Sequence, residues 1–310
     1  MIVNNNPKIS IVSPIYKAEH FLDRLVDEIE KAMLVLDVEY EIILVDDRSK
    51  DRSWEIMKAL SSRKSSIKSI RLSRNFGQHP AIMAGLSHAN GEWIIVMDCD
   101  LQDQPKEIVK LYHKAQEGFE IVQARRKNRE DGFLKKLSSK IFSKVYGYFT
   151  DTKYDNEIAN YGIYKKQVIK SLLEVSDYIK FFPLFIAFVG YRSTSITVEH
   201  APRASGTTSY TFSKLMSLAF NTIISFSNKP LKLFVKFGMV ISLLSFCVGM
   251  YYIYQAVHNE IEVLGFTSII VSIWFLSGII ITTIGVVGIY IGKIFDQTKG
   301  RPVYIIDEIV

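Results

Sequence analysis

Short apolar runs alternate with segments of helical periodicity over the first half of the chain. The runs are short and rich in β-branched residues, as expected for strands, and they are Ile9–Val12, Glu41–Val45, Ile67–Leu72, Trp93–Met97 and Ile121–Ala124. Between them, apolar residues recur at helical spacing, first at Phe21, Leu22, Leu25, Val26 and Ile29 and later at Ile108, Leu111 and Tyr112. This alternation predicts an α/β domain whose mainly parallel sheet is covered by helices on both faces.

Two long apolar stretches, Phe237–Val257 and Phe266–Gly292, lie in the last quarter of the chain. Each has about 20 or more nearly uncharged residues, enough for a helix to cross a bilayer. A buried hairpin in a soluble core is disfavoured, because core helices normally keep a polar face. We therefore expect a two-helix transmembrane hairpin.

The basic residues around this hairpin predict its orientation. Lysine or arginine flanks both outer ends, at Lys229, Lys232, Lys236, Lys293, Lys299 and Arg301, whereas the connector 258–262 has neither. Positive residues are retained on the cytoplasmic side, and no apolar segment typical of a secretory signal occurs near the amino terminus. We expect a multi-pass protein of the inner (cytoplasmic) membrane, with its amino-terminal domain and both termini in the cytoplasm.

Composition narrows the range of partners. The chain has 310 residues, 48% of them hydrophobic, and a formal net charge of +6, a length that permits one large or two ordinary domains. Basic residues cluster at 125–129, at 135–136 and before the first apolar stretch, so membrane lipids with anionic headgroups are the expected partner. Nucleic acid is disfavoured, because no aromatic stacking motif or helix-turn-helix accompanies these residues. The two cysteines, Cys99 and Cys247, favour a reducing compartment over a disulfide framework or a zinc site.

Polar residues follow three of the predicted strands, in the segments 13–19, 46–49 and 98–100. Parallel sheets bind their ligands outside the carboxyl ends of the strands. Neither a Gly-x-Gly-x-x-Gly loop nor a Walker-type Gly-Lys-Ser is present, which argues against a standard dinucleotide or P-loop pocket.

An acidic pair, Asp98 and Asp100, directly follows the apolar strand Trp93–Met97. Mg²⁺ is often held by one or two carboxylates together with substrate phosphates and water. The polar turn beyond the pair contains Gln102, whose amide oxygen either completes the metal shell or belongs to an ordinary loop, and Pro105 is placed to open a helix. Alone, Asp-x-Asp is a weak signal, since acidic turns are common.

Several spaced segments give the chain a resemblance to glycosyltransferase family 2, and within it to the polyprenyl-phosphate group of bactoprenol glucosyltransferases and dolichyl-phosphate mannose synthases. The segments are Ser10–Tyr16, Val45–Asp51, Arg71–Gly77, Met97–Asp103, Arg203–Gly206 and Lys299–Tyr304. The resemblance implies a GT-A fold, Mg²⁺ or Mn²⁺ as cofactor, and inverting transfer of a sugar. The donor would be a nucleotide-sugar, with a UDP-sugar as first choice, and the acceptor a polyprenyl phosphate at the membrane surface, within a pathway that builds a cell envelope glycan.

The resemblance also implies roles at the nucleoside. Pro14, Tyr16 and Glu19 would border it, and Asp47 would hydrogen-bond its base. Two structural alternatives stay open. Pro14 and Tyr16 could be turn and packing residues, and Asp46 and Asp47 could cap a helix over Trp54–Leu60.

At the diphosphate, the resemblance implies that Asp98 would contact the ribose and the metal, and that Asp100 would contact the metal and the diphosphate. Gln102 would complete the metal shell. Arg71 and Arg74, after the third strand, could reach phosphate oxygens as charged donors or simply be solvated.

The segment 203–210 resembles the family's arginine-containing loop, which would close over the diphosphate and exclude water. The planar fork of Arg203 suits bidentate contact with phosphate oxygens, and a simple surface loop is the alternative. Apolar residues at helical spacing follow over 212–224 and suit a helix lying on the membrane, or else an ordinary core helix.

Asn160 departs from the family pattern, because relatives commonly carry an aspartate there that is assigned as catalytic base. An amide cannot accept a proton as a carboxylate does. A phosphate monoester has a second pKa near 6, so a lipid phosphate is largely a dianion at neutral pH and needs no base. Asn160 would then orient the acceptor or the sugar. Asp155 and Glu157 are alternative bases, although their register against the family pattern is wrong.

We therefore expect a catalytic domain over 1–206, amphipathic juxtamembrane helices over 207–232, a membrane hairpin over 233–292 and a cytoplasmic tail over 293–310. Glycines at 278, 285, 288 and 292 would let helices pack closely within or between chains, so a homo-oligomer stays open. Two other functions also stay open, a family 2 polysaccharide synthase and a noncatalytic nucleotide-binding membrane scaffold.

Overall fold

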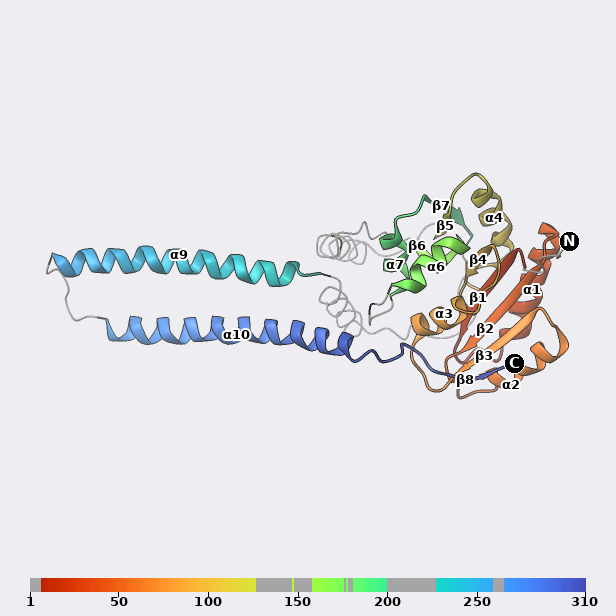
Figure 1. The fold of residues 1–310 in the computed structure, drawn as a ribbon, viewed down its shortest axis with the longest axis horizontal. Coiled ribbons are helices and arrows are strands. Elements are labelled where there is room, and N and C mark those ends of the chain that lie inside the picture. The colour runs from red at the N-terminus through yellow and green to blue at the C-terminus, as the bar shows by residue number, and fades with distance from the viewer. Residues whose placement is uncertain are drawn as a thin grey trace. The chain divides into compact units, whose positions relative to one another are not determined.

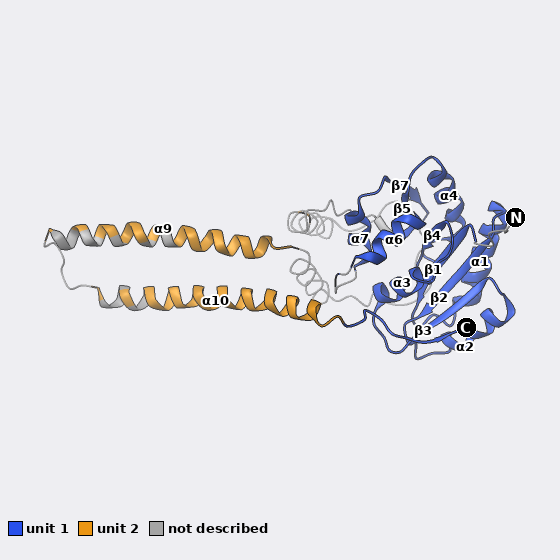
Figure 2. Ribbon diagram, viewed as in Figure 1, with its two compact units in different colours: residues 1–144, 152–209, 301–310 blue, residues 145–151, 210–300 orange. Residues whose placement is uncertain are grey.

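The protein divides into two compact units (Figure 2). Unit 1 comprises residues 1–144, 152–209 and 301–310, and unit 2 comprises 145–151 and 210–300. The structure, a computed structural model, describes residues 7–126, 147, 158–175, 177, 181–199, 227–258 and 265–310. The predicted Arg203 loop, most of the predicted juxtamembrane helices and the basic residues at 127–129 and 135–136 lie outside these residues.

Unit 1 is built on an eight-stranded mixed sheet (Figure 1). The strands are β1 (Ile9–Ile15), β2 (Tyr40–Asp46), β3 (Ile67–Leu72), β4 (Trp93–Val96), β5 (Ile121–Arg126), β6 (Ile158–Lys165), β7 (Ser193–Val198) and β8 (Ile306–Ile309). Their order is β7-β5-β6-β4-β1-β2-β3-β8. Strand β6 runs antiparallel to β4 and β5, β8 runs antiparallel to β3, and the other pairs are parallel. The five predicted strands and the mainly parallel sheet are confirmed.

Helices cover both faces of the sheet, as predicted. The first face carries α1 (Leu22–Leu36), α2 (Ser53–Arg63) and α4 (Ile108–Gln116), the last preceded by a 3₁₀ turn at Pro105–Glu107. The second face carries α3 (Gln78–Leu86), α6 (Lys166–Glu174) and α7 (Phe182–Val189). In α1 the apolar residues at helical spacing form one stripe that is buried against the strands. Leu22, Leu25 and Ile29 of this stripe are fully buried.

The strand order reverses between β1 and β4. From β1 the chain builds β2 and β3 on one side and then crosses to place β4 on the other. The β1–β4 ladder ends at Val12 and Val96, whereas β1 stays paired with β2 as far as Ile15. Pro14 lies past the last rung with β4, where its missing N–H leaves no ladder bond unmade. Such a switch point is where open α/β sheets bind ligands.

The last residues of the chain form the edge strand β8. Ile70 is opposite Ile309, and Ser69 and Val310 exchange two backbone hydrogen bonds of 2.8 Å. The segment 301–310 therefore belongs to the compact unit of the sheet, although the two long helices precede it in sequence.

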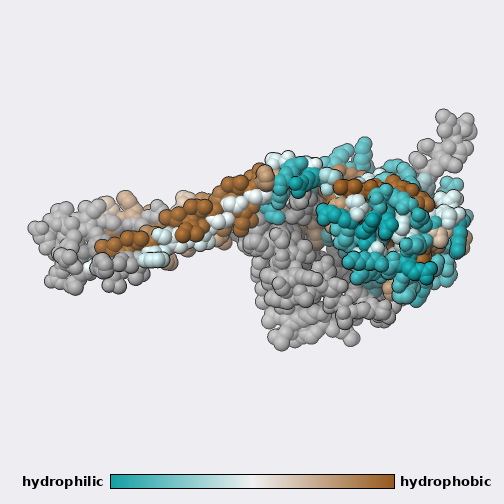
Figure 3. All heavy atoms as spheres, turned by 90° about the horizontal axis from the view of Figure 1, so that it is seen from below, coloured by the Kyte–Doolittle hydropathy of each residue, from teal (hydrophilic) through white to brown (hydrophobic). Residues whose placement is uncertain are grey.

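Unit 2 contains the helices α9 (Lys229–Val257) and α10 (Phe266–Thr298). Each is long and apolar enough to cross a membrane by length and composition, with candidate spans Lys229–Val248 and Ser272–Thr298 of mean hydropathy 2.0 that are 0% buried. Figure 3 shows the resulting hydrophobic surface in brown. Among the described residues, none outside the adjoining turns of the helix has an atom within 4 Å of where a Cβ on Gly278, Gly285, Gly288 or Gly292 of α10 would lie.

Candidate active site

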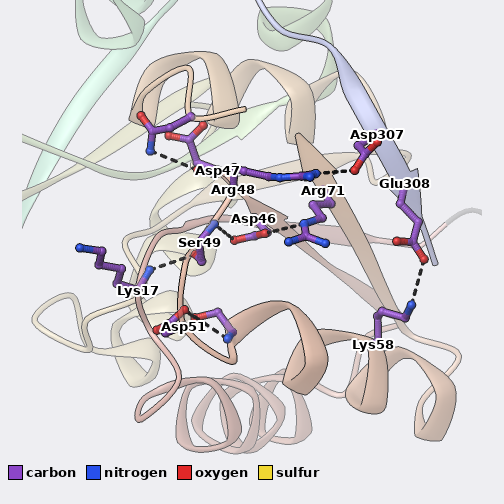
Figure 4. Close-up of polar contacts among 12 residues, drawn as sticks. Lys17, Asp46, Asp47, Arg48, Ser49, Asp51, Lys58, Arg71, Asp307 and Glu308 are labelled. Carbon is purple, nitrogen blue, oxygen red and sulfur yellow. Dashed lines mark hydrogen bonds and ion pairs between the residues drawn. The ribbon is translucent and has the colours of Figure 1, made fainter. Parts of the chain in front are cut away.

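The loops that follow β1 and β2 are tied together by backbone hydrogen bonds to serine hydroxyls. The N–H of Lys17 donates to Ser49 Oγ at 3.0 Å (Figure 4). The N–H of Ala18 donates to Ser53 Oγ at 2.9 Å. Since Ser53 opens α2, the first loop is fixed to the amino end of that helix. These two hydrogen bonds hold the turn in which Tyr16 leaves the sheet.

Glu19 belongs to the same set of contacts. Its N–H donates to Asp51 Oδ2 at 3.3 Å, and its Oε2 accepts the N–H of Arg52 at 3.0 Å. Asp51 also accepts the N–H of Ser53 at 3.2 Å. Glu19 therefore shapes the loop through its carboxylate, and Asp51 accepts the N–H of the first residue of α2. The alternative that Asp46 or Asp47 caps this helix is wrong, because both carboxylates bond elsewhere.

Asp46 is fully buried at the end of β2. Its Oδ1 accepts the N–H of Ser49 at 2.9 Å, and its Oδ2 lies 3.4 Å from Arg71 Nε. Burial raises the pKa of Asp46, while Ser49 and Arg71 oppose the rise. The Arg71 guanidinium also lies over the Trp54 ring, 5.4 Å from its centroid. Arg71 therefore pairs with the buried Asp46 and is not simply a solvated arginine.

Asp47 holds the loop that follows β3. Its Oδ1 accepts the N–H of Phe76 at 2.7 Å and its Oδ2 accepts the N–H of Gly77 at 2.8 Å, while its carbonyl oxygen accepts Asn75 Nδ2 at 3.1 Å. Burial raises the pKa of Asp47, and the two backbone donors oppose that rise. Gly77 has φ +101°, a conformation that residues with a side chain rarely adopt. Asp47 therefore connects the loop after β2, in which it lies, to the loop after β3.

The acidic pair lies beyond the end of β4 and is half-buried. Gln78 Nε2, from the first residue of α3, donates to Asp98 Oδ1 at 2.7 Å. Asp100 Oδ1 accepts the N–H of Gln102 at 3.2 Å, which closes the turn after the pair. Cys99, between them, packs against the hydrophobic core, and burial together with the two neighbouring carboxylates raises its thiol pKa to about 12.

Asn160 comes to the same edge of the sheet from β6. Val96 and Gly162 form the last pair of the antiparallel β4–β6 ladder, and Asp98 and Asn160 each lie two residues beyond that pair, at the same end of the ladder. The Tyr164 hydroxyl donates to the carbonyl oxygen of Asn160 at 3.2 Å. A Cβ on Gly162 would lie 2.8 Å from that hydroxyl, so the glycine makes room for this contact.

Tyr16 and Arg74 are exposed residues of the loops that follow β1 and β3. Tyr16 is 45% exposed, with Lys17 Nζ 5.4 Å from its ring centroid. The Arg74 guanidinium lies over the Phe76 ring at 4.4 Å and remains exposed. Exposed aromatic and guanidinium groups suit a nucleoside and a phosphate, respectively.

Three of the loops contain a residue with a side chain in the left-handed region: Lys17 (φ 55°), Arg48 (φ 57°) and Leu101 (φ 59°). Lys17 and Arg48 each lie two residues after the end of a strand, β1 and β2 respectively, and Leu101 lies in the loop that follows β4. Such conformations are costly and concentrate at ligand-binding loops.

The donor set fits a hard divalent cation. Asp98, Asp100 and Gln102 offer only oxygen ligands, and a carboxylate has about four acceptor positions, so it can accept an existing hydrogen bond and still ligate. Among the described residues no group of three His, Cys, Asp or Glu side chains could hold a metal. Two carboxylates suit a cation that keeps water and phosphate ligands, as Mg²⁺ and Mn²⁺ do.

The structure adds residues that the sequence analysis did not single out. Gln78 orients Asp98, Ser49 and Ser53 hold the first loop, and Tyr164 touches the Asn160 backbone. Only the position of Gln78, immediately after a glycine and at the start of a helix, gave a sequence signal. Arg203 lies outside the described residues.

Comparison with known proteins identifies the family of this site. Residues 10–174 match the family Glycosyl transferase family 2. An undecaprenyl-phosphate 4-deoxy-4-formamido-L-arabinose transferase of Yersinia pestis is 34% identical over 98% of this chain and 94% of its own length. An uncharacterized glycosyltransferase of Synechocystis sp. is 34% identical over 97% of this chain and 95% of its own length.

The fold has solved counterparts as well. Mannosyl-3-phosphoglycerate synthase from Rubrobacter xylanophilus superposes with a TM-score of 0.53 at 15% identity, covering 71% of this chain and 72% of that one. The likeness confirms the GT-A type of sheet and helices.

Proposed function

Since the chain belongs to glycosyltransferase family 2, we propose that it transfers a sugar from a nucleotide-sugar to a polyprenyl phosphate at the cytoplasmic face of the inner membrane. The observation that carries the proposal is the acidic pair Asp98 and Asp100 at the strand-order reversal between β1 and β4. The Yersinia pestis relative, named for an undecaprenyl-phosphate acceptor, matches nearly the whole chain and supports that acceptor class.

The loop after β1 would receive the nucleoside of the donor. The exposed Tyr16 ring offers a face for the base, and Pro14 and Glu19 border the same turn. Asp47 is the proposed acceptor of a base N–H. Its carboxylate can accept that bond beside its bonds to Phe76 and Gly77, since each oxygen has two lone pairs.

Asp98, Asp100 and Gln102 would hold Mg²⁺ or Mn²⁺. When bound, such a cation neutralises negative charge that grows on the departing nucleoside diphosphate. Gln78 keeps the Asp98 carboxylate oriented through its 2.7 Å hydrogen bond. Arg74 and Arg203 are proposed to contact the diphosphate oxygens, Arg203 from a loop that closes over the donor and excludes water.

The acceptor phosphate would attack the anomeric carbon from the face opposite the diphosphate, and the configuration would invert. A phosphate dianion attacks without losing a proton, so no carboxylate base is required at Asn160. The Asn160 amide can donate to an oxygen of the acceptor or the sugar and hold it in line. Its backbone is held by Tyr164, which makes β6 a rigid support for that contact.

The sheet supports the proposed membrane topology. Strand β8 pairs with β3, so the segment after α10 must lie on the same side of the membrane as the segment before α9. Two crossings by α9 and α10 would satisfy that requirement, and the lysines at both outer ends support a cytoplasmic location for the sheet domain.

A donor screen tests the proposal. The purified full-length protein in detergent is incubated with undecaprenyl phosphate, Mg²⁺ and, in turn, UDP-, GDP- and dTDP-sugars, with 4-deoxy-4-formamido-L-arabinose among the UDP-linked sugars. Mass spectrometry should detect one sugar added to the lipid phosphate with a UDP-sugar. Release of free sugar with no lipid product from any donor would contradict a lipid-phosphate acceptor. Absence of any donor turnover would instead favour a binding scaffold.

A further inference from the structure

The carboxyl-terminal segment touches three parts of unit 1 that lie far from it in sequence. Asp307 pairs with Arg48 in the loop after β2. The carbonyl oxygen of Ile305 accepts the N–H of Ser73, where the loop after β3 begins, at 2.9 Å. The Tyr304 hydroxyl lies 2.9 Å from Ser87 Oγ, at the end of α3. The segment thus borders the loops after β2 and β3, both of which build the donor site.

Arg48 is in a conformation that needs support. Its φ of 57° lies in the left-handed region, which is unfavourable for a residue with a side chain because Cβ comes too close to the following carbonyl oxygen. It stands between Asp47, whose carboxylate holds Phe76 and Gly77, and Ser49, whose hydroxyl holds Lys17. A change in the Arg48 backbone would therefore displace Asp47 and Ser49, and with them the loops after β3 and β1 that these two residues hold.

We propose that Asp307 is a positioning residue for the donor site: by pairing with Arg48 it holds the loop after β2 in its left-handed turn and so fixes the loops after β1 and β3. Figure 4 shows Asp307 extending from β8 toward Arg48, with Asp46, Asp47 and Ser49 beside it. The effect on transfer rests on the proposed function, whereas the effect on the loop does not.

The same strand offers a matched control. Glu308, the next residue of β8, pairs with Lys58 of α2 at 3.0 Å, and the two acidic side chains are similarly exposed, at 46% for Asp307 and 41% for Glu308. Lys58 lies within α2, away from the site loops. Asp307→Asn and Glu308→Gln therefore remove the same charge from the same strand, and only the first removes a contact to a site loop.

Hydrogen exchange of the full-length protein without substrate tests the loop directly. Asp307→Asn should speed exchange in peptides covering 46–53 and 73–78, while Glu308→Gln should leave them at the wild-type rate. Equal exchange in the two variants would overturn the proposal, whether or not the protein proves to be a sugar transferase.

Steady-state kinetics then test the consequence for the donor. Asp307→Asn should raise the donor KM about three- to fivefold with kcat within about twofold, the range expected for an exposed ion pair. Glu308→Gln should leave both constants unchanged. An Asp307→Asn variant with unchanged donor KM beside an active wild type would contradict the positioning role alone, whereas an inactive wild type would contradict the proposed function.

Arg48→Gln tests the pair from its other side. Without the guanidinium the contact with Asp307 is lost, so Arg48→Gln should raise the donor KM about as much as Asp307→Asn. Arg48→Gln combined with Asp307→Asn should raise the donor KM no further, because both changes break the same pair. A double variant whose effect on KM is the product of the two single effects would show that the two residues act independently, and the positioning role of Asp307 would be wrong.

Discussion

Asp98 and Asp100 alternate along the chain with Cys99, which packs against the core. The alternation lets a buried strand end directly in two carboxylates at the site. Gln78 and the N–H of Gln102 orient one oxygen of each carboxylate, so the pair is arranged before any ligand binds. Such prior arrangement is what electrostatic stabilisation of a leaving group requires.

Asp100→Asn should lower glycolipid formation by more than about a hundredfold, because an amide cannot supply the negative charge that holds a divalent cation beside the diphosphate. Asp37→Asn, at the exposed carboxyl end of α1, removes the same charge away from the site and should behave as wild type. The measurement is the rate of product formation in detergent at saturating Mg²⁺. Full activity in Asp100→Asn would refute the metal site.

Asn160→Ala should reduce kcat by about tenfold without abolishing transfer, since one orienting hydrogen bond contributes roughly 1–1.5 kcal/mol. Asn160→Asp is the informative companion. If no base is needed, the carboxylate should give no gain over wild type at pH 7, because it repels the acceptor phosphate. A variant with aspartate that is faster than wild type would show that proton removal limits the reaction.

Among the elements, α3 joins the site to the second face of the sheet. Its first residue, Gln78, touches Asp98, and its second, His79, is half-buried, with its ring 4.7 Å from that of Phe181 just before α7. Burial lowers the pKa of His79 to about 4. His79 is therefore neutral in the folded protein at physiological pH.

The shifted pKa predicts a pH-dependent stability. Because the folded pKa lies below the ordinary value of about 6.5, the unfolded chain binds more protons, and stability is lost as pH falls from about 6.5 toward 4. The loss from this group between pH 7.5 and 5.5 is about 1 kcal/mol. Thermal unfolding of the full-length protein in detergent should show a smaller pH dependence in His79→Phe. An identical pH dependence in both proteins would show that His79 titrates normally.

The elements also show how far the sequence could be interpreted. The strands β1 to β5 were predictable because each is a continuous apolar run, and α1 and α4 because their apolar residues keep one helical face. Strand β8 was not, because Ile306–Ile309 is short and gains its partner β3 only through pairing across more than two hundred residues of sequence. Strand β7 alternates exposed and half-buried residues over most of its length and lacks an apolar run.

Residue roles were predictable in kind but not in detail. The position of Asp47 after a buried strand marked it as a site residue, yet only the fold shows Phe76 and Gly77 within 2.8 Å of its carboxylate. The sequence likewise left Arg71 between phosphate contact and solvation, because its partner Asp46 lies on another strand and the pair forms only when β2 and β3 align.

At the scale of the whole molecule, the sheet takes its edge strand from beyond the apolar helices. The chain therefore leaves the sheet domain, passes through α9 and α10, and returns to the same sheet. In the proposed reaction the acceptor has a membrane-embedded tail and a charged head. Such an acceptor suits a donor site that is tied to the proposed membrane hairpin at both of its ends.

The topology predicts which segments a membrane-impermeant maleimide can reach. A cysteine introduced in the connector, Asn259→Cys, should be labelled in intact cells with a permeable outer membrane. Lys31→Cys, on an exposed turn of α1, should be labelled only after lysis. Labelling of Lys31→Cys in intact cells would contradict a cytoplasmic catalytic domain, and protection of Asn259→Cys would contradict a membrane-crossing hairpin.

The mass of the lipid product tests the central claim most directly. Full-length wild-type protein with undecaprenyl phosphate and its sugar nucleotide should yield the lipid phosphate plus one sugar, joined through a single phosphate, with nucleoside diphosphate released. Asp100→Asn should yield none. A product heavier by a second phosphate, or equal product from Asp100→Asn, would contradict sugar transfer by the acidic pair at the end of β4.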